Sequence, residues 1–129
     1  MTEGSTTVQV ERYRQTLSEM AHLAGEQGHT DNERRWSRLV GELQDARAEL
    51  EASAEGRAAI AGLMADTRPT VRLWSAAAVL FWDEASARPT LEALRESPIR
   101  YGLHSITAKH TLLEYDAGRL SPNDALPGS

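Results

Sequence analysis

Apolar residues recur three or four positions apart along almost the whole chain, which is the spacing of one face of an α-helix. The clearest stripe consists of Trp36, Leu39, Val40, Leu43, Ala46 and Leu50. No segment shows a sustained alternation of apolar and polar residues, so no β-sheet is expected. The 129 residues are enough for one domain. The sequence therefore predicts an all-α fold.

Turn-forming residues divide the apolar stripes into six expected helices, arranged as three consecutive pairs. We expect an N-terminal pair in residues 7–52, a second pair in 54–82 and a third in 84–117. The individual helices are expected at about 7–26, 31–52, 54–66, 69–82, 84–96 and 99–117. Residues 119–129 show no periodicity and are expected to form a flexible tail. We therefore predict one helical domain over residues 1–118.

Several residues have the chemistry of helix starts. Ser53 is expected to cap the third helix, and Pro69 suits the first turn of the fourth, where its missing N–H costs nothing. Asp83 is placed to favour the N-terminal dipole of the fifth helix. Thr30 and Glu33 have the spacing of a capping box. The sixth helix is expected to present a stripe of Ile99, Leu103, Ile106, His110 and Leu113.

Composition excludes several classes of function. The chain has no Cys, which excludes disulfides, thiolate metal sites and Cys nucleophiles. Its net charge of −5 argues against nucleic-acid and anionic-membrane partners. The N-terminus lacks the apolar segment of a signal peptide, and no apolar run in the chain is long enough for a membrane span. Because Arg far outnumbers Lys and Ala is abundant, as GC-rich genomes favour, we expect a bacterial cytoplasmic protein.

No motif indicates catalysis, a cofactor or a metal site. The four histidines, His22, His29, His104 and His110, lack the spacing of a helical zinc site. The sequence has no nucleophile elbow and no glycine-rich phosphate loop. Adjacent acids such as Asp83 and Glu84 are usually caps or solvated charges. We therefore expect no enzyme.

Three acidic residues of the second helix, Glu42, Asp45 and Glu49, are spaced so that they form a ridge along it. Such charge runs are usually a solvated face. This ridge, however, lies toward the C-terminal end of the helix, where the helix dipole disfavours acids, and Arg47 offsets only part of its charge. We therefore interpret the ridge as a candidate docking surface for a basic partner.

Two further groups are candidates for partner binding. Arg72 and Arg100 each follow a proline by two or three residues and open a helix. Such arginines either pair with an acid of a neighbouring helix pair, for which Asp66 or Asp83 would serve, or bind an acidic or phosphorylated partner together with nearby His104. Both alternatives stay open at this point.

The second group lies at the end of the fourth helix. Trp74 and Trp82 are both expected to pack in the core, and Trp82 is the more accessible of the two if one is exposed. An exposed Trp82 beside Asp83 and Glu84 would have the character of an interface hot spot.

Residues 66–80, DTRPTVRLWSAAAVL, resemble the inner helix of a HEAT repeat, and the Val-Arg pair at residues 71–72 recurs as Ile-Arg at 99–100. The stretch from Val10 to Leu120 is similar to a family of small bacterial proteins of unknown function with an armadillo/HEAT-like fold. This resemblance implies a short right-handed stack of helices, an α-solenoid, with no cofactor and no established enzymatic activity. Small HEAT-like proteins are also similar to immunity proteins encoded beside bacterial contact-dependent toxins.

The resemblance and the acidic ridge together predict a non-enzymatic immunity protein that neutralises a basic toxin by direct binding. One alternative is a regulatory or scaffold module of a metabolic or assembly complex, which would use the face around Arg72, Ser75, Arg100 and His104. Another is an enzyme with an unrecognised site near His104 and His110. The expected partner is a protein, not nucleic acid or membrane, and the chain is expected to be a monomer or a weak homo-oligomer.

Overall fold

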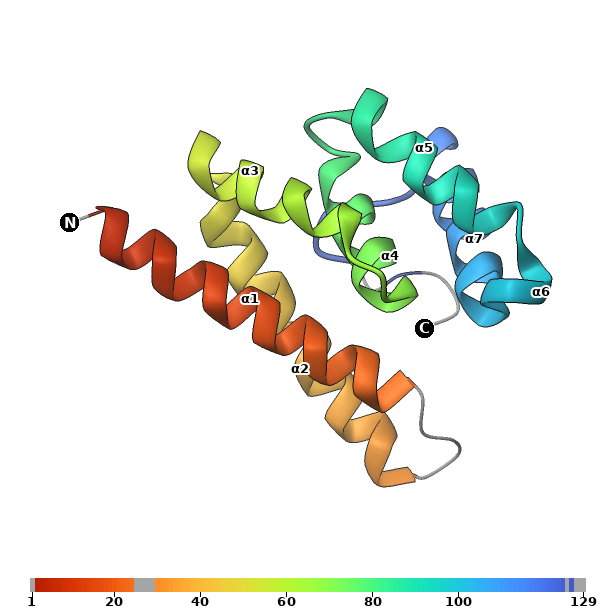
Figure 1. The fold of residues 1–129 in the computed structure, drawn as a ribbon, viewed down its shortest axis with the longest axis horizontal. Coiled ribbons are helices and arrows are strands. Elements are labelled where there is room, and N and C mark those ends of the chain that lie inside the picture. Colours follow the sequence, from red (N-terminus) through yellow and green to blue (C-terminus); the bar gives the residue numbers. More distant parts are fainter. Residues whose placement is uncertain (1, 25–29, 125, 127–129) are drawn as a thin grey trace. The chain divides into compact units, whose positions relative to one another are not determined.

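The computed structural model describes residues 2–24, 30–124 and 126 of the chain. Within these ranges the regular structure consists of seven α-helices and one 3₁₀ helix, with no strand (Figure 1). The prediction of an all-α fold is therefore confirmed. The helices belong to two compact units, Met1–Gly62 and Leu63–Ser129. No helix among the described residues is both long and apolar enough to cross a membrane.

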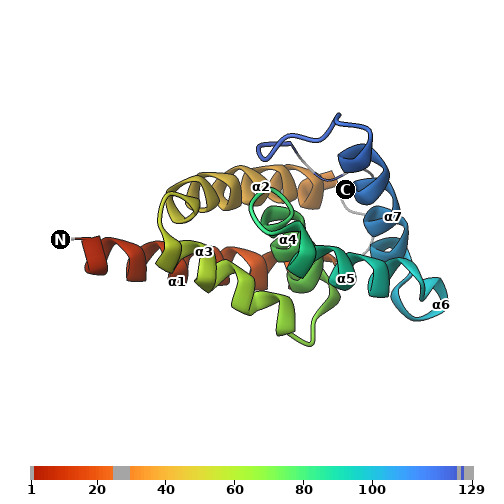
Figure 2. The same cartoon turned by 90° about the horizontal axis from the view of Figure 1, so that it is seen from above.

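The first unit contains three helices, α1 (Thr2–Ala24), α2 (Thr30–Glu51) and α3 (Ala54–Gly62). Helices α1 and α2 run antiparallel side by side, and α3 packs against both of them (Figures 1 and 2). The apolar stripes predicted from the sequence are buried here. The buried apolar residues of this unit are Tyr13, Leu17, Met20, Leu23, Leu39, Leu43, Ala46, Leu50 and Ile60.

The junction between α2 and α3 is tight and depends on two small residues. The Gly56 N–H donates a hydrogen bond of 3.0 Å to Ser53 Oγ, so the prediction that Ser53 caps this helix is confirmed. Gly56 is buried, and a Cβ atom at this position would lie 2.0 Å from the carbonyl oxygen of Leu50. Only glycine therefore allows α3 to start this close to the end of α2.

The second unit is built around α4 (Pro69–Val79), which packs against α5 (Glu84–Arg95) and α7 (Leu103–Asp116). The short η1 (Leu63–Ala65) and α6 (Pro98–Tyr101) precede α4 and α7, respectively. Every residue of α4 from Thr70 to Val79 is buried except Arg72. The small side chains of residues 76–78 are among them, which lets neighbouring helices approach closely.

The predicted starts of α4 and α5 are confirmed. Pro69 is the first residue of α4. Asp83 caps α5, because its carboxylate accepts hydrogen bonds from Ser86 N–H at 3.4 Å and Ser86 Oγ at 2.7 Å. The predicted stop in residues 25–28 lies outside the described residues, as does the Thr30 side chain of the predicted Thr30–Glu33 capping box.

Other helix boundaries differ from the prediction. Helix α1 begins at Thr2 rather than near residue 7, and α4 ends at Val79 rather than at residue 82. The expected third helix becomes α3 followed by the separate η1. The single helix expected over residues 99–117 is wrong: the chain breaks at Gly102, whose φ of 53° and ψ of −120° are not helical, and α6 and α7 are separate helices. Six helices were expected where the described residues hold seven.

Residues 119–129 were expected to be a flexible tail, but their described part makes contacts. Arg119 donates two hydrogen bonds of 2.8 Å to the Glu114 carboxylate. The Ser121 N–H donates a hydrogen bond of 2.8 Å to Asp124. Leu126 is only 5% exposed. These residues are therefore held by specific contacts.

Candidate binding surfaces

The three residues of the predicted acidic ridge all lie on α2. Asp45 and Glu49 are exposed, and Glu42 is half-buried. None of the three carboxylates forms an ion pair with any residue in the described ranges. Their negative charge is therefore not neutralised locally.

Arg47, the base that was expected to offset part of the ridge, is buried with only 3% of its surface exposed. Its guanidinium donates hydrogen bonds to Gln44 Oε1 at 2.7 Å and to Glu51 Oε2 at 2.5 Å. The charge of Arg47 also acts on the phenol of Tyr13 on α1. Burial raises the pKa of Tyr13, and the positive Arg47 opposes this rise. Arg47 thus lies in the interior of the first unit rather than on the outer face of the ridge.

A hollow of about 480 Å³ lies between α1 and α2 and includes one residue of the ridge, Glu42. The α1 residues that line it are Thr7, Val8, Glu11, Arg12, Gln15, Thr16 and Glu19. Its lining contains three carboxylates and one guanidinium, so it is acidic. Val8 is 63% exposed and adds an apolar contact. We call this hollow, together with Asp45 and Glu49, the acidic surface.

The carboxylates of the hollow differ in how they are paired. Glu11 binds Arg14 at 2.7 Å, and Glu19 lies 3.7 Å from Arg35. All four of these side chains are about half exposed, and such surface pairs contribute little stability. Glu42 has no such partner within the described part of the chain. Among the three carboxylates of the hollow, Glu42 is therefore the one most available to a cation from outside.

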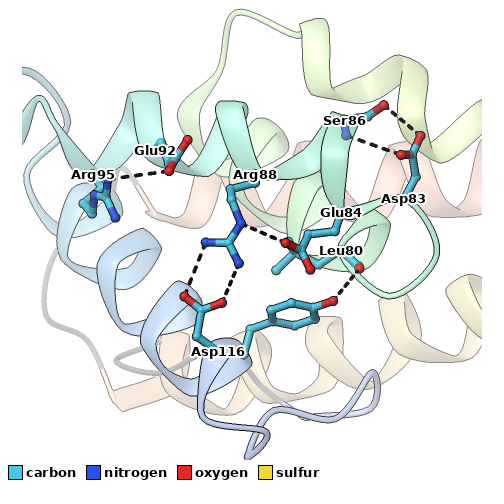
Figure 3. Close-up of polar contacts among 9 residues, drawn as sticks. Leu80, Asp83, Glu84, Ser86, Arg88, Glu92, Arg95 and Asp116 are labelled. Carbon is cyan, nitrogen blue, oxygen red and sulfur yellow. Dashed lines mark hydrogen bonds and ion pairs between the residues drawn. The ribbon is translucent and has the colours of Figure 1, made fainter.

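The acidic residues of the predicted group at residues 82–84, Asp83 and Glu84, have structural roles (Figure 3). Asp83 caps α5, and Glu84 accepts a hydrogen bond of 3.1 Å from Arg88 Nε. Trp74 is 4% exposed whereas Trp82 is half-buried, which agrees with the expectation that Trp82 is the more accessible of the two. The two carboxylates are therefore already engaged within the second unit.

Arg88 joins α5 to the end of α7. Its guanidinium donates hydrogen bonds to both carboxylate oxygens of Asp116, the one from Nη1 being 3.3 Å long (Figure 3). This contact lowers the pKa of Asp116 and raises that of Arg88. Next to it, the Tyr115 hydroxyl donates a hydrogen bond of 3.2 Å to the carbonyl oxygen of Leu80. These contacts fix how α7 is rotated against its neighbours.

Of the two alternatives for Arg72, the ion pair with Asp66 or Asp83 is wrong. Asp66 binds Arg68 at 3.0 Å, and Asp83 serves as a helix cap. The guanidiniums of Arg72 and Arg100 instead each lie 5.2 Å from the centre of the Tyr101 ring. Both Nη atoms of Arg72 are 3.5 Å from the Tyr101 hydroxyl.

These contacts gather two positive charges around one phenol. A hydrogen bond from Arg72 and the charges of Arg72 and Arg100 lower the pKa of Tyr101. Neither Arg72 nor Arg100 has a carboxylate partner among the described residues. The pair is therefore a cationic site without a counter-charge of its own.

His104 lies at the start of α7 beside this group. Its Nε2 atom is 2.7 Å from Thr70 Oγ1 on α4. Burial lowers the pKa of His104, and a backbone hydrogen bond to Tyr101 opposes that shift. Ser75, which was expected on the same face, is fully buried and donates a hydrogen bond of 2.7 Å to the Val71 carbonyl. It is not available for binding.

The apolar stripe expected for the sixth helix faces outward, which its spacing in the sequence did not indicate. Its aliphatic residues and their exposed fractions are Ile99 (103%), Leu103 (77%), Ile106 (48%) and Leu113 (52%). The buried residues of α7 are small or polar, apart from one leucine, and comprise Ser105, Thr107, Ala108, Thr111 and Leu112. We call the four exposed residues the aliphatic patch.

Two buried hydroxyls of α7, those of Ser105 and Thr111, donate hydrogen bonds to backbone carbonyls. Thr111 Oγ1 donates a hydrogen bond of 2.7 Å to the Thr107 carbonyl, and Ser105 Oγ donates one of 2.8 Å to the carbonyl of Arg95 on α5. Burying these two hydroxyls therefore leaves neither of them unpaired. The presence of Gly102 between Ile99 and the rest of the stripe was the one sequence signal for a break.

No group of three or more His, Asp or Glu residues in the described ranges is placed to hold a metal ion. Comparisons of the chain with protein-family models, with curated proteins and with solved structures give no match. The function must therefore be argued from the surfaces described above.

Proposed function

We propose that the chain is a non-enzymatic protein-binding module, and more specifically an immunity protein that neutralises a basic toxin by direct binding. The observation that carries this proposal is the position of Glu42, which has no ion-pair partner among the described residues and lines an acidic hollow with Glu11 and Glu19. The proposal includes a HEAT-like stack of helices in a bacterial cytoplasmic protein that is a monomer or a weak homo-oligomer.

The charge of the first unit supports a basic partner. Residues 1–62 contain eleven Asp and Glu residues against seven Arg residues, a net charge of −4. A surface of one sign raises the rate of encounter with a partner of the opposite sign by about 10- to 1,000-fold at low salt. Because Glu42, Asp45 and Glu49 lack local counter-charges, they contribute directly to this field. Such steering suits a protein that must capture a toxin quickly.

The acidic residues near the helix ends of the second unit have partners within that unit. Asp83 caps a helix, and Glu84 and Asp116 both bind Arg88. Glu114 binds Arg119 at 2.8 Å, which lowers the pKa of Glu114. These contacts favour a binding role over catalysis at these residues.

The test is a growth assay with the protein encoded by the neighbouring gene. That protein is expressed alone and together with the chain in the same bacterial host, and cell growth is recorded. We expect it to arrest growth alone and to be neutralised by the wild-type chain but not by the variant E42K/D45K/E49K. The matched control E92K/E96K/D124K reverses three charges in the second unit and should still protect. Protection by E42K/D45K/E49K, or a neighbour that does not arrest growth, would contradict the proposal.

A regulatory or scaffold module is the second candidate, and a different observation favours it. The exposed aliphatic patch on α6 and α7 lies next to the cationic pair Arg72 and Arg100, so the second unit offers a surface unlike the acidic one. A module with two unlike surfaces can hold two partners. Co-purification with a housekeeping enzyme, in the absence of a toxic neighbour, would favour this alternative.

A further inference from the structure

The aliphatic patch is exposed because of the way α7 packs against its neighbours. The sequence of α7 would equally allow this face to be buried. Leu103, Ile106 and Leu113 lie on one face of this helix. If that face were turned inward, they would form an ordinary core stripe. The contacts of Tyr115 with Leu80 and of Asp116 with Arg88 hold the helix with this face outward. Large aliphatic residues that are gathered on a surface mark sites of interaction.

Charge lies at one end of the same surface. Arg100 and Tyr101 are between Ile99 and Leu103 in the sequence, and Arg72 reaches the Tyr101 ring from α4. Arg100 is exposed, and its contact with the ring face leaves its N–H groups free of any carboxylate among the described residues. A guanidinium binds a carboxylate with two parallel hydrogen bonds. This end of the surface is therefore suited to acidic side chains.

We infer that the aliphatic patch, with Arg72 and Arg100, binds an acidic amphipathic helix of a partner protein. The spacing of Leu103, Ile106 and Leu113 matches the ridges of a helix that packs against another helix, whose own apolar residues would recur at positions i, i+3 or i+4, and i+7. The two arginines select acidic residues at the end of that helix. This site differs from the acidic surface of the proposed function in its unit, its charge and its partner.

A second copy of the chain fits this surface poorly. A symmetric dimer would place the same patch of both copies face to face. Arg72 and Arg100 of one copy would then lie near the same arginines of the other, and like charges brought together at an interface are costly. An acidic partner removes this repulsion and neutralises the cationic pair.

The experiment selects binders from a phage-displayed library of random peptides of about 16 residues, roughly four helical turns. The full-length chain is the bait, and selected peptides are labelled and their affinities measured by fluorescence anisotropy. The variants are I99S/L103S, R72Q/R100Q and R100Q. The last changes only an exposed residue, so it keeps the test valid if R72Q lowers stability. The controls R34Q and R34Q/R38Q remove one or two exposed charges from the first unit.

We expect peptides with apolar residues at helical spacing and with several Asp or Glu residues. Their affinity should fall about tenfold or more in I99S/L103S and R72Q/R100Q, and to a smaller extent in R100Q, but not in the controls. The inference is overturned if no peptide of this kind is selected, or if its binding is unaffected by these changes. It is also overturned if light scattering detects a dimer of the wild-type chain that is lost in I99S/L103S. Selection of basic peptides that depend on Glu42 would instead support the proposed function alone, so the two proposals can fail separately.

Discussion

The Tyr115 hydroxyl on α7 donates a hydrogen bond of 3.2 Å to the carbonyl oxygen of Leu80, the residue that follows α4. The Tyr115 ring also meets Phe81 edge-on, with 5.6 Å between ring centres. These two contacts tie the end of α7 to the end of α4. They therefore help to decide which face of α7 is buried.

Replacing Tyr115 with Phe should lower the free energy of unfolding by about 1 kcal/mol, because the ring is kept but the hydrogen bond to Leu80 is lost. Urea denaturation followed by circular dichroism measures this change. Y101F is the matched control: its hydroxyl has only the long 3.5 Å contacts with Arg72, and its effect should be below about 0.5 kcal/mol. Equal effects of the two changes would show that the Leu80 contact is unimportant.

Two glycines of the first unit should respond in opposite ways to alanine. In G56A the new Cβ atom meets the Leu50 carbonyl at 2.0 Å, so α3 must shift, and we expect a loss of about 2 kcal/mol or more. In G41A nothing lies within 4 Å of the new Cβ, and Gly41 is within α2. That variant should gain about 0.5–1 kcal/mol from helix propensity. Chemical denaturation measures both changes, and a stable G56A would contradict the described junction.

Gly102 should be intolerant of side chains although there is open space around it. Nothing lies within 4 Å of a Cβ at this position, but its φ of 53° disfavours any other residue. G102A should therefore cost about 1–3 kcal/mol from backbone strain alone. If G102A were neutral or stabilising, α6 and α7 could join into one helix, and the surface around Tyr101 would change.

His104 should make stability depend on pH. Burial lowers its pKa below the ordinary value of 6.5, so in the acidic range the unfolded chain binds a proton more readily than the folded one. The contribution is fully present above pH 6.5 and is lost as the pH falls through the folded pKa. In H104Q, urea denaturation between about pH 7 and pH 5 should show a weaker decline in the free energy of unfolding. H110Q, which changes an exposed histidine of the same helix, should leave the decline as it is.

Local signals in the sequence predicted where several helices begin. Ser53, Pro69 and Asp83 act on backbone groups within three residues of themselves, so their roles do not depend on the rest of the fold. The end of α4 and the break at Gly102 were missed. An isolated glycine is often tolerated within a helix, so Gly102 alone did not distinguish a helix from a break.

The rotation of α7 could not be predicted from periodicity. Its aliphatic residues have the spacing of a core stripe, yet Thr107 and Thr111 are buried and Leu113 is exposed. Contacts with residues far away in the sequence, such as that of Tyr115 with Leu80, 35 positions away, determine the outcome. Apolar spacing shows that a helix has a face, but tertiary contacts decide where that face points.

The candidate sites were predictable to different extents. The ridge of Glu42, Asp45 and Glu49 follows from spacing within one helix. The hollow that Glu42 shares with Glu11 and Glu19 depends on how α1 packs against α2, which the sequence does not state. The stacking of Arg72 and Arg100 on Tyr101 likewise requires two separate elements, α4 and α6, to meet.

The most direct test of the central claim is the association rate constant between the chain and the basic protein identified by the growth assay. Stopped-flow fluorescence measures it at about 20 mM and about 200 mM salt, where screening differs strongly. If the acidic surface binds this partner, the wild-type rate falls steeply with salt. E42K/D45K/E49K should then associate at least about tenfold more slowly at low salt, with little salt dependence. An unchanged rate and affinity in this variant would contradict the claim that the acidic surface binds the partner.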